Sequence, residues 1–258
     1  MDPEISEFSY GFALTRELIA TLGLEHAGAP EFATQYAEGK AGGGWDLKLP
    51  ALPIYLQFKR SYPMVSRRAG ESKLFATLPF FRMHFHPRDD SDQHQLLLDL
   101  EDRGNLVLYA APGFSKSSEL SDAYSRDRMA DSSIFLKPSA TGPLPDDERH
   151  WVAFQMSPSL TYFCSKPKAL RVESPNVLFG RDALLQKALS RNLLLDENFF
   201  SNIAEELLEV YSRRRSSQEI GAPIDQFRQL RDRRSPPDFA QLLAQTLFGC
   251  ELLVVFPK

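Results

Sequence analysis

Apolar residues recur along the chain at two spacings, one typical of helices and one typical of strands. In residues 4–22 the spacing is helical, with about 100° between successive side chains. The side chains that share this face are Ile5, Phe8, Phe12, Ile19 and Leu22. We therefore predict a helix that buries this face and stops at Gly23.

Shorter runs predict strands and the segments that connect them. The predicted strands of the first half are residues 31–36, 45–49, 54–59, 80–85 and 106–111. The last run is apolar throughout, which is typical of a strand in the middle of a sheet. Residues 92–102 fit a helix that is capped near Gly104 and buries Leu96, Leu97 and Leu100. The order helix, strands, helix, strand describes an α/β layer fold.

The second half of the chain is less regular and becomes helical after residue 179. Strands are predicted at 133–136, 152–156 and 251–256, and helices at 119–128, 182–192, 196–215 and 238–247. We therefore predict an α/β core in residues 1–165 and a mainly helical C-terminal region in residues 166–258. This region either forms a unit of its own or packs with the core as one domain.

The composition is that of a globular protein. The chain has 258 residues, 43% of them hydrophobic, and a net charge of −4, so nucleic acid would have to meet a local basic patch. Cys164 and Cys250 lie too far apart for a zinc or redox motif. No apolar run approaches the ~20 residues that cross a bilayer, and the acidic start is unlike a secretory signal. These features predict a cytoplasmic protein with no membrane contact.

Polar residues in two of the predicted strands form a candidate metal site. Asp46 lies on the strand 45–49, and Gln57 and Lys59 lie on the strand 54–59. Side chains two residues apart leave a strand on the same face. If the two strands are antiparallel neighbours, a carboxylate, an amide and the Phe58 carbonyl can bind a divalent cation, and the amine can stabilise phosphoryl charge. The alternative is a polar edge strand with an exposed lysine.

These residues resemble a known family. The pieces Gly44-Trp45-Asp46 and Gln57-Phe58-Lys59-Arg60-Ser61, set between helix–strand units, are similar to the PD-(D/E)XK nuclease superfamily. The closest similarity is to its Mrr-type branch, in which Gln replaces the usual acidic residue. The resemblance covers about residues 4 to 112 and implies a restriction-endonuclease-like mixed sheet flanked by helices. It also implies metal-dependent cleavage of DNA, with RNA as the alternative substrate, in bacterial genome or anti-phage defence.

The resemblance also implies roles for individual residues. Asp46, Gln57 and the Phe58 carbonyl would bind Mg²⁺ or Mn²⁺, and Lys59 would position the water or stabilise the transition-state charge. The family usually adds a glutamate from the first helix. Glu7 lies beside the apolar stripe and is preferred, Glu17 falls nearer the solvent side, and Glu38 is a third candidate. The neutral Gln57 leaves open a catalytically inactive module that binds nucleic acid or a partner protein.

Basic residues follow the candidate site closely. They are Arg60, Arg67, Arg68, Arg82 and Arg88, and they could hold phosphates beside the site. A second group, residues 213–215 and 228–234, is equally well explained by charged helix ends. For His94 we prefer core hydrogen bonding to a place at the rim of the site. A nuclease must be controlled, so a regulatory protein partner or a homo-oligomer is expected. A purely structural protein with no nucleic-acid role is the remaining alternative.

Overall fold

The computed structural model describes residues 2–22, 53–157, 159–164, 167–190, 198–214, 227, 229–231 and 233–254. The predicted strands 31–36 and 45–49 lie outside these residues, and so do Asp46 and Glu38. The described part is a mixed α/β structure with two sheets. None of its helices is long and apolar enough to cross a membrane.

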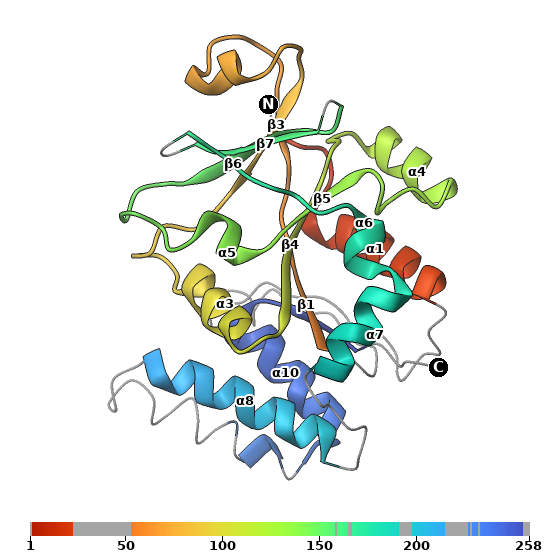
Figure 1. The fold of residues 1–258 in the computed structure, drawn as a ribbon, viewed down its shortest axis with the longest axis vertical. Helices are drawn as coiled ribbons and strands as arrows, with labels where there is room; N and C mark the ends of the chain where they lie inside the picture. The colour runs from red at the N-terminus through yellow and green to blue at the C-terminus, as the bar shows by residue number, and fades with distance from the viewer. Residues whose placement is uncertain are drawn as a thin grey trace.

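The first sheet carries the candidate site. Its strands, in spatial order, are β5 (Ser133–Leu136), β4 (Leu106–Pro112), β1 (Pro53–Phe58) and β9 (Glu251–Val254). β1 runs parallel to β4 and antiparallel to β9, while β5 is antiparallel to β4 (Figure 1). Every residue of β4 is buried, which confirms its predicted place inside the sheet. β9 comes from the far end of the described chain, so the sheet joins the two halves of the sequence.

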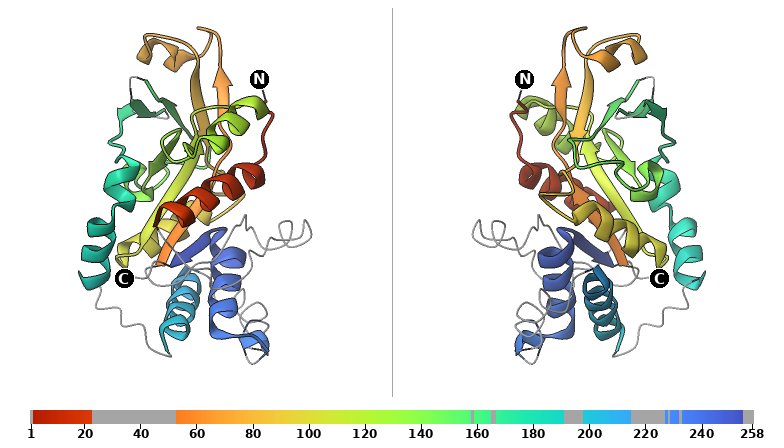
Figure 2. Two further views of the ribbon diagram at one scale, coloured as in Figure 1. Left: turned by 90° about the vertical axis from the view of Figure 1, so that its right-hand side faces the viewer. Right: turned by 90° about the vertical axis from the view of Figure 1, so that its left-hand side faces the viewer.

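Helices cover both faces of this sheet. α1 (Glu7–Leu22) packs on the face that carries Ile54, Leu56 and Phe58, while Tyr55 points into a larger core on the opposite face. Figure 2 shows α1 and α3 (Gln93–Asp102) on opposite sides of the sheet. Because residues alternate along a strand, Gln57 and Lys59 face α3 together with Tyr55. The predicted helix at 92–102 is confirmed, including burial of its leucines and a left-handed Gly104 after its end (φ 85°).

The buried face of α1 differs from the predicted one. Phe8 and Phe12 are 50% and 47% exposed, so the apolar stripe assigned to them is wrong. The side chains that α1 buries are instead Tyr10, Ala13, Leu14, Glu17 and Leu18. Tyr10 donates a hydrogen bond from its hydroxyl to Ser133 Oγ at 2.8 Å. Hydrogen bonds of buried polar side chains therefore help to set the rotation of the helix. A prediction from the spacing of apolar residues cannot include them.

The second sheet lies beside the first and is antiparallel throughout. Its strands, in spatial order, are β2 (Tyr62–Met64), β3 (Phe80–His84), β6 (Trp151–Gln155), β7 (Leu160–Phe163) and β8 (Lys168–Ala169). β3 and β6 were predicted, whereas β2, β7 and β8 were not. Met83 and Val152 point into the larger core, so their neighbours along β3 and β6 face outward, where the short helix η1 (Gly70–Leu74) lies.

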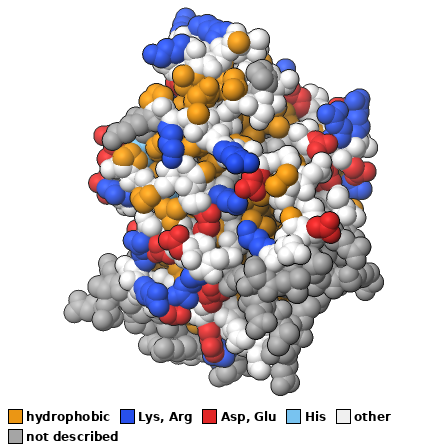
Figure 3. All heavy atoms as spheres, viewed as in Figure 1, with side chains coloured by type: hydrophobic (Ala, Val, Ile, Leu, Met, Phe, Trp, Pro, Cys, Tyr) orange, Lys and Arg blue, Asp and Glu red, His pale blue; other side chains and the backbone are white. Residues whose placement is uncertain are grey.

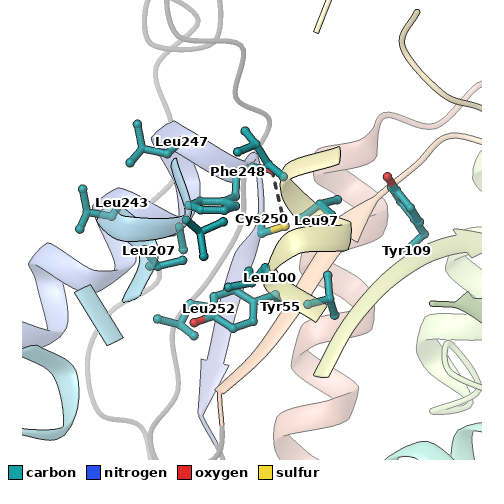
Figure 4. Packing of buried hydrophobic residues seen from close by; sticks show 14 of the residues in the cluster. Tyr55, Leu97, Leu100, Tyr109, Leu207, Leu243, Leu247, Phe248, Cys250 and Leu252 are labelled. Atoms are coloured by element: carbon teal, nitrogen blue, oxygen red, sulfur yellow. Dashed lines mark hydrogen bonds between the residues drawn. The ribbon is translucent and has the colours of Figure 1, made fainter. Parts of the chain in front are cut away.

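The remaining helices pack around the sheets. They are α4 (Ser117–Ser125), α5 (Pro138–Thr141), α6 (Pro175–Phe179), α7 (Arg181–Ser190), α8 (Phe199–Arg214) and α10 (Pro236–Phe248). α8 and α10 bury their leucines against α3, Tyr55 and Leu252 (Figure 4). One hydrophobic cluster therefore runs from the first sheet into the C-terminal helices, as expected if they pack with the core as one domain.

Candidate functional site

Gln57 and Lys59 are brought together by Gln93, the first residue of α3. Lys59 Nζ donates to Gln93 Oε1 at 3.1 Å, and Gln93 Nε2 donates to Gln57 Oε1 at 2.8 Å. This confirms that the two side chains share one face of β1. Lys59 is only 5% exposed and follows a strand that has a neighbour on each side. The alternative of an exposed lysine on an edge strand is therefore wrong.

The lysine fixes the direction of these hydrogen bonds. An ammonium group only donates, so Gln93 must turn its oxygen toward Lys59 and its NH₂ group toward Gln57. Gln57 in turn donates from Nε2 to the carbonyl oxygen of Phe58 at 3.1 Å. The positions of the oxygen and nitrogen in the Gln93 and Gln57 amides are therefore fixed by the donors and acceptors around them.

Two opposing effects act on the pKa of Lys59. Burial lowers its pKa, while the Glu7 carboxylate opposes that shift and favours the charged form. Glu7 accepts a hydrogen bond from the backbone amide of Arg60 at 3.1 Å, directly after Lys59. The pKa of His86 is lowered first by its partial burial and then by the charge of Lys59. Glu7, Lys59 and His86 therefore lie within electrostatic reach of one another at the end of β1.

Glu17 lies away from Lys59 and has a structural role. It is buried, not turned to solvent as expected, and its carboxylate accepts hydrogen bonds from the amides of Met129 at 2.5 Å and Ala130 at 2.9 Å. Both carboxylate oxygens are used to hold the turn that leads into β5. The structure thus brings Glu7, and not Glu17, to the group around Lys59.

The Glu17 contacts predict a stability effect. Glu17→Ala leaves two amides without their partner, so the free energy of unfolding should fall by about 1–3 kcal/mol. Urea denaturation measures this, with Glu148→Ala, which removes an exposed carboxylate, as the matched control. Equal losses in both variants would contradict the assigned role.

Three described residues near the end of β1 could supply oxygen ligands to a metal ion. Glu7 offers a carboxylate, Gln57 an amide oxygen and Phe58 a carbonyl oxygen, which are the hard ligands that Mg²⁺ prefers. Within the described ranges, no group of three or more His, Cys, Asp or Glu could hold a metal ion. A second carboxylate would have to come from Asp46, which lies outside these ranges.

Described strands occupy both sides of β1. β9 occupies the antiparallel side of β1 from Pro53 to Leu56, and β4 occupies the parallel side from Ile54 to Phe58. The strand predicted at 45–49, which would pair with β1, lies outside the described residues. On the β9 side, the pairing ends at Leu56, just before Gln57.

His94 forms a buried hydrogen-bonded pair behind Lys59. Its Nε2 lies 2.9 Å from the carbonyl oxygen of Gly142, and its Nδ1 lies 2.8 Å from the hydroxyl of Tyr109. A carbonyl only accepts, so Nε2 carries the proton and Nδ1 accepts from Tyr109. Burial lowers the pKa of His94 to about 4. Core hydrogen bonding, the preferred expectation, is confirmed.

His94 should make stability depend on pH. Its pKa is about 4 in the folded protein against 6.5 for an ordinary histidine, so between these values only the unfolded chain binds the proton. The free energy of unfolding should therefore fall as the pH is lowered through this interval, by roughly 3 kcal/mol in total. His94→Gln should flatten this dependence in urea denaturation at several pH values. An unchanged slope would contradict it.

The five arginines expected to hold phosphates differ in their contacts. Arg88 forms a surface ion pair with Asp147 at 2.8 Å. Arg67 donates to the carbonyl oxygens of Ser72 and Phe75, and Arg82 pairs with the buried Glu71, so both are committed to the fold. Arg60 and Arg68 are exposed. Arg67 and Arg68 lie just before η1, at the end of the molecule where Figure 3 shows Lys and Arg above a group of hydrophobic side chains.

Gln93 is the site residue that the sequence did not reveal. It occupies the polar first turn of a helix that was predicted correctly, and an isolated glutamine there carries no signal of its own. Comparison with known proteins adds no further assignment, since no protein-family model, no curated protein and no solved structure matches the chain.

Proposed function

We propose that this protein is a metal-dependent nuclease that cleaves DNA phosphodiester bonds at the end of β1, with RNA as the alternative substrate. The observation that carries the proposal is the buried Lys59 ammonium, which is hydrogen-bonded to a neutral amide and not to a carboxylate. Burying a charge is costly unless it is compensated, and a phosphate in this position would compensate it. Buried groups with shifted pKa values are typical of functional sites.

The proposal includes the restriction-endonuclease-like fold. The first sheet and its helices follow in the order α1, β1, α3, β4, with β2, η1 and β3 of the second sheet inserted after β1. This order, with β1 and β4 parallel, is compatible with the fold that the resemblance implies. A bound Mg²⁺ or Mn²⁺ would polarise the phosphoryl group and lower the pKa of a bound water. Asp46, the Gln57 amide oxygen and the Phe58 carbonyl would hold it, with Glu7 completing the set. Lys59 would stabilise the negative charge that develops on the phosphate.

A catalytically inactive module that binds nucleic acid or a partner protein is the second candidate. It is favoured by the state of Gln57, whose oxygen and nitrogen are both engaged, one with Gln93 and the other with the Phe58 carbonyl. A neutral amide is also a weaker metal ligand than a carboxylate.

Plasmid cleavage separates the two candidates. We expect the wild-type protein to nick supercoiled DNA with Mg²⁺ or Mn²⁺ and not with EDTA, and we expect Asp46→Ala to abolish this. Asp89→Ala, which removes an exposed carboxylate elsewhere, is the matched control. Binding of DNA without cleavage by any variant would support the inactive module, and equal cleavage by all would point to a contaminant.

The biological setting rests on the resemblance alone. We propose bacterial genome or anti-phage defence, with activity held in check by a regulatory protein partner or by homo-oligomerisation. Size-exclusion chromatography with light scattering, with and without DNA, tests the second of these.

A further inference from the structure

A row of aromatic and arginine side chains crosses the outer face of the second sheet. Tyr62 on β2 meets His84 on β3 edge to face, with ring centroids 5.0 Å apart, and His84 lies 6.2 Å from the ring of Trp151 on β6. We call Tyr62, His84, Trp151, Arg60 and Arg82 the aromatic row. Their side chains leave the strands away from the larger core, because the intervening residues Met83 and Val152 point into it.

Each end of the row carries a guanidinium group. Arg60 lies 5.4 Å above the ring of Tyr62 and donates to its hydroxyl at 2.8 Å. Arg82 lies 4.9 Å above the ring of Trp151, and the buried Glu71 accepts from both Arg82 and the Trp151 indole NH. Glu71 thereby fixes one end of the row, whereas Arg60 at the other end is exposed.

Two of the three charges that act on His84 are positive. Burial lowers the pKa of His84, and the charges of Arg82 and Arg149 lower it further, with Glu71 opposing them. Because Glu71 is already paired with Arg82, Arg60 and Arg149 supply charge that can meet a polyanion. Half-buried aromatic rings beside exposed arginines offer what single strands need, namely π-faces for bases and cations for phosphates.

The row begins at the candidate site. Arg60 directly follows Lys59, and its backbone amide donates to Glu7. His86, two residues beyond His84, feels the charge of both Lys59 and Glu7. A nucleic-acid strand bound along the row from Trp151 to Arg60 would therefore reach Lys59.

We propose that the aromatic row binds single-stranded nucleic acid, with bases stacked on Tyr62, His84 and Trp151 and phosphates held by Arg60 and Arg149. Delivery of this strand to Lys59 rests on the proposed function, whereas binding itself does not. Duplex bases are already stacked on one another, so a duplex would use only the arginines and bind more weakly. The row therefore favours unpaired nucleic acid as the substrate of the site, including the unpaired stretches of a supercoiled plasmid.

Binding without metal tests the row independently of cleavage. Fluorescence anisotropy in EDTA follows a labelled oligo-dT of about 20 nucleotides, longer than the site of a single binding fold. We expect Tyr62→Ala and Arg60→Glu each to raise the Kd by roughly tenfold, the value of one lost base stack, and Arg60→Glu also to reduce the salt dependence.

A second arginine–tyrosine pair provides matched controls. Arg16 lies 4.6 Å above the ring of Tyr124, far from the row in sequence. Tyr124→Ala and Arg16→Glu should leave the Kd unchanged. Thermal melting checks that each variant is folded, and the exposed Arg60 keeps the test valid if Tyr62→Ala does not fold.

Stacking has its own optical readout. Trp45 and Trp151 are the tryptophans of the sequence, so in a Trp45→Phe protein the indole fluorescence comes from Trp151. Oligo-dT should quench it, whereas inorganic phosphate and a poly-glutamate peptide should not. The same length of oligo-U distinguishes RNA from DNA.

Several results would overturn the proposal. They are an unchanged Kd in both row variants, tighter binding of duplex than of single strand, or equal binding of poly-glutamate. If the row variants lose binding but the wild-type protein never cleaves, the row is supported as a binding site and the proposed nuclease function is wrong. Cleavage by a protein whose row variants bind normally would do the reverse.

Discussion

Lys59→Met is expected to reduce DNA cleavage by at least about 100-fold, the usual effect of removing one group that stabilises transition-state charge. Methionine matches the length of the lysine stem and keeps the buried side of β1 filled, so the loss would report the missing ammonium. Initial rates on supercoiled plasmid with Mn²⁺ measure it. Lys73→Met, at an exposed position of η1, is the matched control.

The pH profile should identify Lys59 as the group responsible. Burial lowers the pKa of Lys59, so its charge is lost on the alkaline side at a lower pH than that of an ordinary lysine. If cleavage needs the charged amine, the rate should fall over this range. Lys59→Arg keeps its charge at all such pH values, so any activity it retains should not show this fall. Equal rates for Lys59→Met and wild type would exclude a role in charge stabilisation.

Leu252→Ala is expected to lower the free energy of unfolding by about 2–5 kcal/mol, as is typical when a buried leucine is truncated. Leu252 is the Cα partner of Tyr55 and joins the cluster between the first sheet and α10. The variant therefore leaves a cavity where the two halves of the chain meet.

Urea denaturation followed by far-UV circular dichroism measures this loss. Val177→Ala, which truncates a side chain that is 57% exposed, should change stability by no more than about 0.5 kcal/mol. If the C-terminal helices melted separately from the sheet, two transitions would appear, and the shared core would not be cooperative.

The elements that could be predicted are those whose signals are local. β1, β4 and α3 were found from runs of five or more patterned residues, and Gly104 from its place after the helix at 92–102, where it adopts φ 85°. Strand order was not accessible, because β9 reaches β1 across most of the chain. β7 and β8 were missed because they are only four and two residues long, and their extended form depends on pairing of β7 with β6 and of β8 with β7.

The candidate site was predictable only in part. The same-face placement of Gln57 and Lys59 follows from strand geometry alone. The bridging of both by Gln93 depends on how α3 crosses the sheet, which no spacing in the sequence records. Which of Glu7 and Glu17 lies near Lys59 depends on the rotation of α1. This rotation is set by the packing of Tyr10 against Phe58 and by the hydrogen bond from Tyr10 to Ser133.

The pairing of β1 with β9 has a consequence for synthesis. β1 emerges from the ribosome early in synthesis. One edge of this strand stays unpaired until β9, which follows α10, has also emerged. Contacts between such distant segments form late and slowly. A nascent or prematurely terminated polypeptide would therefore carry Lys59 without the finished sheet around it. If the proposed nuclease activity is correct, this order of events would keep incomplete copies from cleaving DNA.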